Sequence, residues 1–173
     1  MCSSDLTNDY DNIIIGDSTM DISTRYTGFL SANSYSYAVA GNTACDMIEQ
    51  LETVNVKNVK HIIISTSDGN GLLRGISISI ISNTVKQLVE SLKAKYPEAK
   101  ITIILIHPVQ VSQAENKRSG LNDLIKSDSG ANCFIDPSGL FVNGAKDYLD
   151  SIHYTETISF KVKSLLETCG VFL

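Results

Sequence analysis

The chain has 173 residues, of which 43% are hydrophobic and 19% are charged, and this composition is typical of a globular domain with one sizeable core. Its net charge of −5 argues against a nucleic-acid or anionic-membrane binder, because such proteins need a basic surface. No stretch is long and apolar enough to cross a bilayer. We therefore predict a single domain over residues 1–173, with no nucleic-acid partner and no transmembrane segment.

The N-terminal ten residues contain neither a basic region nor an apolar run, so we expect no secretion signal. The four cysteines are scattered, with no CxxC pair and no metal-ligand spacing, so we expect no metal site. We predict that all four are unpaired, that Cys45 and Cys133 lie in the core, and that the protein is intracellular. The many Ile, Asn, Lys and Ser residues are typical of an AT-rich viral or bacterial genome.

Short apolar runs alternate with longer amphipathic segments along the whole chain. The expected strands lie at 12–16, 35–40, 61–65, 101–106 and 132–135, and the expected helices lie at 43–52, 76–96, 113–126 and 155–168. The first, third and fourth strands are nearly continuous Ile, Leu and Val, as is typical of strands covered on both faces. This alternation predicts an α/β fold with a parallel sheet and helices on both sides.

Polar residues follow the expected strands. Ser18 follows the first strand, Gly41 the second, the segment 65–70 the third and His107 the fourth. Because sites in such folds lie at the carboxyl ends of the strands, we expect these residues to meet the late loop 150–153 at one edge of the sheet. His107 is expected either to line the pocket there or to cap its strand.

Ser18 and His153 have local settings that indicate nucleophilic catalysis. A strand holds Ser18 rigidly while the following turn exposes it, and Asp150 is placed to orient the His153 imidazole as a base. The order Ser, Asp, His is a known arrangement of the hydrolytic triad. Each motif alone has a simpler interpretation: Gly16-Asp17-Ser18 as a turn, and Asp150 as a helix cap beside a surface histidine.

Together these segments resemble the SGNH hydrolase family, also called the GDSL lipase/esterase family. Gly16-Asp17-Ser18 matches its first block, and Asp150-Ser151-Ile152-His153 matches its last. Residues 37–43, Tyr-Ala-Val-Ala-Gly-Asn-Thr, resemble the second block, and residues 67–75 are similar to the third block of its thioesterase and lysophospholipase branch. The four blocks occur in the family's order and span most of the chain.

The resemblance implies a three-layer α/β/α, flavodoxin-like fold with a five-stranded parallel sheet. It implies a serine esterase that hydrolyses a small ester, such as a lipid, a thioester or an acetylated sugar, without a cofactor. Ser18 would be the nucleophile, His153 the base and Asp150 the orienting carboxylate. The backbone N–H groups of Ser18 and Gly41 would form part of the oxyanion hole.

The third block departs from the family pattern. The family has Gly-x-Asn-Asp where this chain has Ser65-Thr66-Ser67-Asp68, so Ser67 stands at the position of the oxyanion-binding Asn. Either the Ser67 hydroxyl or the Asn70 amide could replace that donor.

The departure also leaves open a non-catalytic SGNH-like binding module. A third alternative is a nucleotide-binding flavodoxin-like protein, but the loop after the first strand lacks the Gly-rich sequence that binds phosphate.

Overall fold

The computed structural model describes residues 9–65 and 69–173, and its centre is a sheet of five parallel strands in the order β2-β1-β3-β4-β5. The strands are β1 (Asn12–Ile15), β2 (Ser34–Ser36), β3 (His61–Ser65), β4 (Lys100–Ile104) and β5 (Cys133–Ile135). The predicted five-stranded parallel sheet is confirmed.

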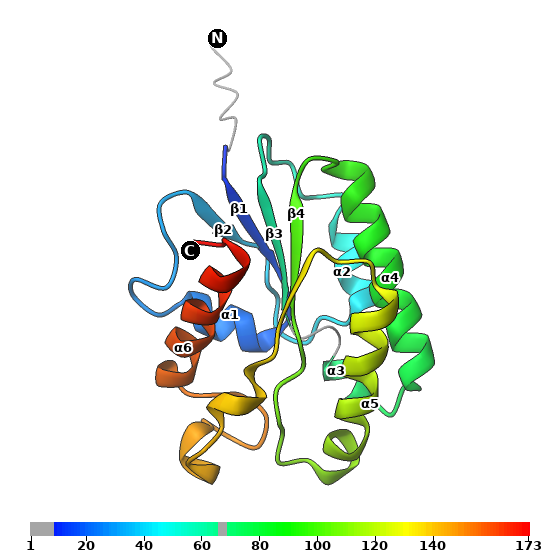
Figure 1. The fold of residues 1–173 in the computed structure, drawn as a ribbon, viewed down its shortest axis with the longest axis vertical. Coiled ribbons are helices and arrows are strands. Elements are labelled where there is room, and N and C mark those ends of the chain that lie inside the picture. The colour runs from blue at the N-terminus through cyan, green and yellow to red at the C-terminus, as the bar shows by residue number, and fades with distance from the viewer. Residues whose placement is uncertain (1–8, 66–68) are drawn as a thin grey trace.

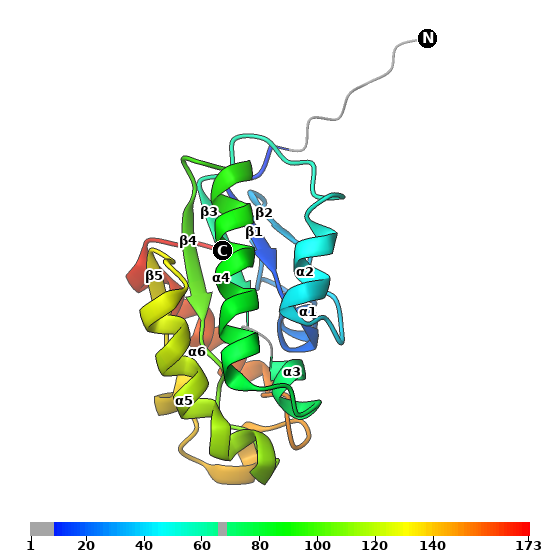
Figure 2. The ribbon, with the colours of Figure 1, turned by 90° about the vertical axis from the view of Figure 1, so that its right-hand side faces the viewer.

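Helices cover both faces of this sheet (Figures 1 and 2). One layer contains α2 (Ala44–Gln50), α4 (Ile78–Lys95) and α5 (Ser112–Asp128), and the other contains α1 (Ser18–Thr24) and α6 (Glu156–Leu166). The shorter elements are α3 (Gly69–Leu73), η1 (Pro137–Leu140), η2 (Gly144–Asp147) and η3 (Glu167–Cys169). The fold is therefore the predicted three-layer α/β/α arrangement.

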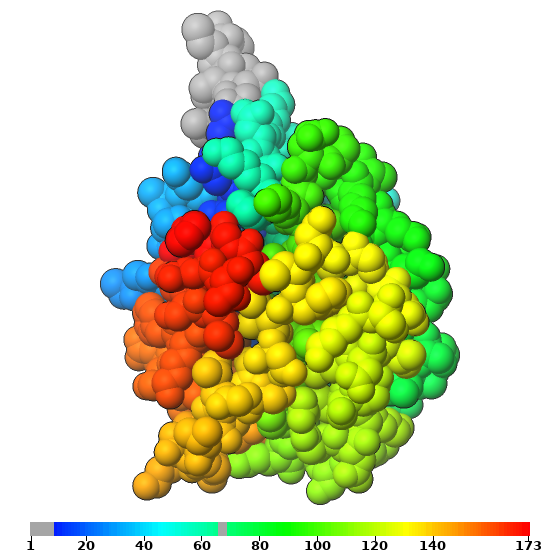
Figure 3. Space-filling model, viewed as in Figure 1, coloured from blue at the N-terminus to red at the C-terminus, as the bar shows by residue number. Residues whose placement is uncertain are grey.

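The segment between β5 and α6 crosses the edge of the molecule at which the strands end. In the space-filling view it is coloured amber to orange and lies against the yellow-green residues of α5 (Figure 3). A hydrogen bond of 3.1 Å from Arg118 Nη1 to Ser138 Oγ joins the two. This contact brings the C-terminal part of the chain to the carboxyl ends of the strands.

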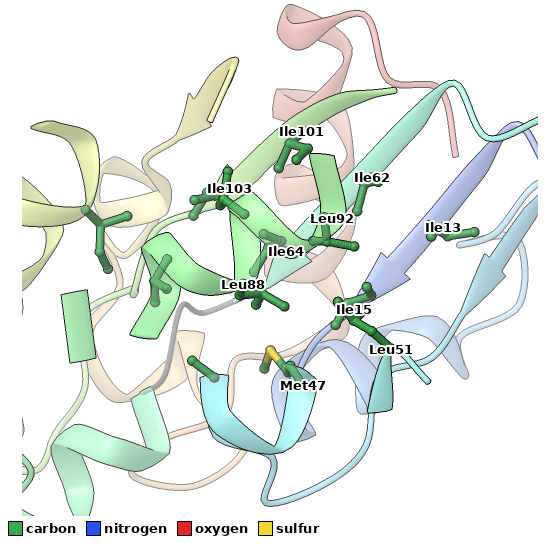
Figure 4. Close-up of a cluster of buried hydrophobic side chains, with 14 of the residues drawn as sticks. Ile13, Ile15, Met47, Leu51, Ile62, Ile64, Leu88, Leu92, Ile101 and Ile103 are labelled. Carbon is green, nitrogen blue, oxygen red and sulfur yellow. The ribbon is translucent and has the colours of Figure 1, made fainter. Parts of the chain in front are cut away.

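The isoleucine run of β1 serves both layers, because successive side chains of a strand point to opposite faces. Ile13 and Ile15 lie in the core beneath α2 and α4 (Figure 4), whereas Ile14 packs in the core beneath α1 and α6. In the neighbouring strand, Ile62 and Ile64 pair with Ile13 and Ile15 and so extend the same face. Burial of each such side chain contributes about 1.5–3 kcal/mol, which explains why both faces of the central strands are apolar.

Helix α4 follows directly from its sequence. The Ser77 hydroxyl caps its N-terminus, and the helix ends at Lys95, because Tyr96, the C-cap residue, precedes a proline. Its buried side chains recur at helical spacing and face the sheet: Ile81, Val85, Leu88, Val89 and Leu92. The structure places this helix at 78–95, within the predicted range of 76–96.

Strand β2 is shorter than predicted, ending at Ser36 instead of residue 40. Pairing with the neighbouring chain nevertheless continues through hydrogen bonds from Tyr37 N to the Ile14 carbonyl and from Val39 N to the Gly16 carbonyl. The regular strand ends because β1, its only neighbour on that side, turns into α1 after Ile15. Helix α3 was not predicted, since five residues are too few to show a helical period.

The cysteine predictions are wrong in two respects. Cys133 and Cys169 form a disulfide, with their Cα atoms 6.0 Å apart, because β5 and η3 bring together residues separated by 36 positions. Cys45 is exposed, since α2 turns Ala44 and Met47 toward the core instead. Cys2 lies outside the described residues. Disulfides persist mainly in oxidising compartments. The expectation of an intracellular protein rested partly on unpaired cysteines, and the disulfide removes that argument for it.

No helix within residues 9–65 and 69–173 has the length and apolar character needed to cross a membrane.

The disulfide can be tested by differential alkylation. Iodoacetamide applied to the unfolded protein without reductant should label Cys45 but neither Cys133 nor Cys169, and reductant should expose both. Peptide mapping by mass spectrometry reads out each site. Labelling of Cys133 and Cys169 without reductant would show that they are free thiols.

Candidate active site

Ser18 lies where β1 turns into α1, and Gly16 makes that turn possible. A Cβ atom on residue 16 would lie 2.8 Å from the Cβ of Ser65 in β3, closer than such atoms approach. The Asp17 carboxylate then caps α1 by accepting a 3.0 Å hydrogen bond from Thr19 N. Ser18 is the first residue of the helix, so its own N–H has no acceptor within α1.

The second half of the site lies on the loop between η2 and α6, in the orange part of the ribbon (Figure 1). Asp150 folds this loop onto itself, because its Oδ1 accepts hydrogen bonds from Ile152 N at 2.7 Å and from His153 N at 2.8 Å. The same carboxylate is therefore held in a fixed orientation relative to the His153 side chain.

Ser18, His153 and Asp150 form a continuous chain of hydrogen bonds. Ser18 Oγ lies 2.8 Å from His153 Nε2, and His153 Nδ1 lies 2.7 Å from Asp150 Oδ2. A carboxylate only accepts, so the proton of a neutral His153 ring is assigned to Nδ1. Nε2 is then an unprotonated acceptor that faces the Ser18 hydroxyl.

Asp150 is a strongly acidic carboxyl group. Burial by itself raises its pKa, but hydrogen bonds from the His153 ring, the His153 N–H and the Ile152 N–H outweigh burial and lower the pKa to about 2. At neutral pH this group is therefore an anion, able to stabilise a positive charge on His153.

A small apolar pocket opens beside Ser18. Its free volume of about 20 Å³ is room for about one water molecule. Its apolar walls come from α3, from the segment after β4, from the start of α5 and from the loop before α6, and they include Leu72, Leu73, Ile106, Val109, Ala114 and Ile152. Gly69 and the polar residues Asp17, Ser18, Thr19, Asn70 and His107 complete the lining. This composition suits a small apolar group held next to a polar reacting centre.

The sequence-predicted oxyanion donors are only partly brought together. Asn70 lines the pocket with Ser18, and its Nδ2 donates a 2.9 Å hydrogen bond to the Asn42 carbonyl. An amide nitrogen has two hydrogens, so one remains for a second acceptor. Gly41, with a φ of +85° that suits glycine, follows β2 and does not line the pocket. Ser67 lies outside the described residues.

Sequence reasoning left the role of His107 open and missed three residues of α5. His107 lines the pocket, as one of the two expectations had it, and its ring also contacts the loop that bears His153. Glu115, Arg118 and Asn122 hold the chain that follows β4, through hydrogen bonds to the backbone of Ile106 and Val109. Their spacing of three and four residues places them on one face of α5. This row of polar residues is the feature of the sequence that could have indicated their role.

Comparisons with known proteins support the fold. No family model and no curated protein matches the chain. Among solved structures, a lipolytic protein of the G-D-S-L family from Veillonella parvula aligns with a TM-score of 0.72 at 18% identity, over 91% of this chain and 96% of that one. A GDSL-like lipase from Bacteroides thetaiotaomicron gives 0.77 at 16% identity, over 91% and 86%.

The esterase EstA from Pseudoalteromonas, in a structure inhibited by monoethylphosphonate, aligns with a TM-score of 0.67 at 15% identity, over 91% of this chain and 95% of that one. At such identities the likeness shows the fold, so this chain has the fold of GDSL lipolytic proteins. The fold expected from the four sequence blocks is confirmed.

The Asp150 carboxyl can be titrated by ¹³C NMR. It should have its midpoint at about pH 2, below the ordinary Asp value of about 3.9. Because the folded pKa is depressed, the contribution of Asp150 to the free energy of unfolding is complete above the unfolded pKa and is lost as the pH falls toward 2. Asp150→Asn should abolish that part of the pH dependence, and a midpoint near 4 would contradict the assigned hydrogen bonds.

Proposed function

We propose that the protein is a serine ester hydrolase that uses Ser18 as its nucleophile, His153 as its general base and acid, and Asp150 as the carboxylate that orients His153. The observation on which this rests is the hydrogen-bond chain of 2.8 Å and 2.7 Å through the three side chains. The fold shared with GDSL lipases and esterases supports the same reaction class.

In the first half of the reaction, Ser18 Oγ attacks the ester carbonyl carbon while its proton passes to His153 Nε2. The resulting imidazolium is stabilised by Asp150 through Nδ1–H. His153 then gives its proton to the departing alcohol or thiol, and an acyl group remains on Ser18. In the second half, His153 removes a proton from water, the hydroxide attacks the acyl carbon, and the returning proton frees Ser18.

The negative charge that develops on the carbonyl oxygen needs donors beside Ser18. The Ser18 N–H at the start of α1 is one. The Gly41 N–H is proposed as a second on the resemblance of residues 37–43 to the family's second block alone, since Gly41 is not among the residues that line the pocket. The Asn70 amide is proposed as the third donor. It lines the same pocket, and only one of its two hydrogens is used in the hydrogen bond to the Asn42 carbonyl. Ser67 is the alternative third donor.

The assignment of the nucleophile is tested with p-nitrophenyl acetate and a fluorophosphonate probe. The wild-type protein should hydrolyse the ester and be labelled on Ser18, and Ser18→Ala should lose both properties while keeping its thermal unfolding midpoint. Ser164→Ala, a change at an exposed serine of α6, is the matched control and should leave both unchanged. A folded wild-type protein that neither reacts nor turns over the ester would indicate a non-catalytic binding module.

The third oxyanion donor is tested separately. If Asn70 supplies it, Asn70→Ala should lower kcat by about 100- to 1,000-fold, and Ser67→Asn should be neutral or harmful. If Ser67 supplies it, Ser67→Asn should raise kcat and Asn70→Ala should change little. Steady-state kinetics with p-nitrophenyl acetate distinguishes the two. Unchanged turnover in both variants would indicate that only the backbone N–H groups of Ser18 and Gly41 stabilise the oxyanion.

A further inference from the structure

The loop that bears His153 contains no strand of the sheet, so other contacts must hold it in place. Three hydrogen bonds tie it to the segment that follows β4. His107 Nε2 lies 2.6 Å from the Ile152 carbonyl, Gln110 N donates to the Ser151 carbonyl at 2.8 Å, and the Tyr148 hydroxyl donates to the Pro108 carbonyl at 2.9 Å. The first of these reaches the residue directly before the proposed base.

The His107 ring is held in one orientation, in which it donates a hydrogen bond to the Ile152 carbonyl. Only 2% of the residue is exposed, and its ring stacks on Phe141 with centroids 5.4 Å apart and meets the edge of Tyr154 at 4.9 Å. A carbonyl only accepts, so Nε2 bears the proton. Nδ1 is then unprotonated, consistent with its having no hydrogen-bond partner in the described part of the chain. Burial lowers the pKa of His107 to about 4, so the ring is neutral at pH 7.

The backbone that bears His107 is itself anchored to α5. Asn122 both accepts from Ile106 N, at 3.1 Å, and donates to the Ile106 carbonyl, at 2.9 Å. Glu115 accepts from Val109 N at 2.9 Å and is paired with Arg118. His107 therefore stands between two residues whose backbone groups are held by a long helix, and its ring has little freedom to shift.

The hydrogen bond from His107 completes the restraint of one peptide unit. The carbonyl of Ile152 and the N–H of His153 belong to the same peptide group. His107 holds the oxygen of that group, and Asp150 Oδ1 holds its N–H at 2.8 Å. A planar peptide group that is hydrogen-bonded at both its oxygen and its N–H can neither rotate nor translate freely. The position of the His153 Cα atom, from which the side chain extends, is therefore restrained.

We propose that His107 is a positioning residue for the reaction: by holding the Ile152 carbonyl, it keeps His153 Nε2 within hydrogen-bond reach of Ser18. This inference rests on the proposed function. It assigns to a buried histidine outside the Ser18–His153–Asp150 chain a role in turnover that does not require contact with the substrate.

The kinetic test compares two substitutions. His107→Phe keeps a ring for stacking but removes the donor, and it should lower kcat for p-nitrophenyl acetate by up to about 100-fold, since small displacements of a catalytic group cost that much. KM should change little. His107→Gln, whose amide nitrogen can reach the same carbonyl, should restore kcat to within a few-fold of wild type. His61→Gln, at the opposite end of the sheet, is the matched control and should behave as wild type.

Two results would overturn the role of His107. A folded His107→Phe protein with wild-type kcat would show that the hydrogen bond does not position the base. Equal losses of kcat in the Phe and Gln variants, parallel to equal losses of thermal stability, would reduce His107 to a packing residue. If the wild-type protein is inactive and unlabelled by the fluorophosphonate, the proposed function fails by itself.

A measurement on the wild-type protein keeps the inference testable even where the variants fail to fold or the enzyme is inactive. ¹⁵N NMR of the histidine rings at pH 7 should show His107 as the neutral Nε2–H tautomer, with a slowly exchanging proton. His107→Gln should leave the His153 ring signals in place, whereas His107→Phe should shift them. An Nδ1–H tautomer for His107 would refute the hydrogen bond to Ile152.

Discussion

The hydrogen bond between Ser18 Oγ and His153 Nε2 joins two segments 135 residues apart, and each of its ends depends on a different part of the fold. Ser18 depends on β1, a central strand buried on both faces. His153 depends on a loop that the sheet does not include. The proposed reaction requires Ser18 and His153 to stay within hydrogen-bond reach of each other, so the two supports have to be rigid relative to each other.

Packing provides the support for Ser18. Ile13, Ile14 and Ile15 are fully buried, and the glycine that follows them lets the turn lie against Ser65 of the adjacent strand. Apolar packing of this kind contains no titratable group, so it does not change with pH. The position of Ser18 is thus set by the same contacts that stabilise the sheet, and the sequence block Gly-Asp-Ser has a steric reason for its glycine.

Hydrogen bonds provide most of the support for His153. Asp150 folds the loop, and His107 and its neighbours tie the loop to the segment after β4, which α5 anchors through Asn122. His107 and Asn122 are buried, so removal of either would leave a buried polar group without its partner, which costs free energy; Asp150 is exposed to solvent. The position of His153, the proposed base, therefore depends on individual hydrogen bonds, each of which a single substitution can remove.

The disulfide supports the same half of the molecule from the other end. Helix α6 starts just after His153, and Cys169 in η3, directly after α6, is joined to Cys133 in the edge strand β5. The helix is thus restrained beyond both of its ends, by the loop at its start and by a covalent bond past its last turn. Its apolar residues Ile158, Val162 and Leu166 pack beneath the sheet between these two points.

The sequence alone determined the five-stranded sheet, its longer helices α2, α4, α5 and α6 and the order of the motifs, but not the short helix α3 or the end of β2. The features that it determined depend on local periodicity and on the rule that parallel strands end at one edge. It also predicted that Ser18, Asp150 and His153 act together, through their types and order. Only the tertiary structure decided that Cys133 meets Cys169, that Asn70 lines the pocket while Gly41 does not, and that His107 holds the Ile152 carbonyl. Each of these is a contact between distant segments whose partners are selected by loop geometry and side-chain direction, and neither leaves a periodic trace in the sequence.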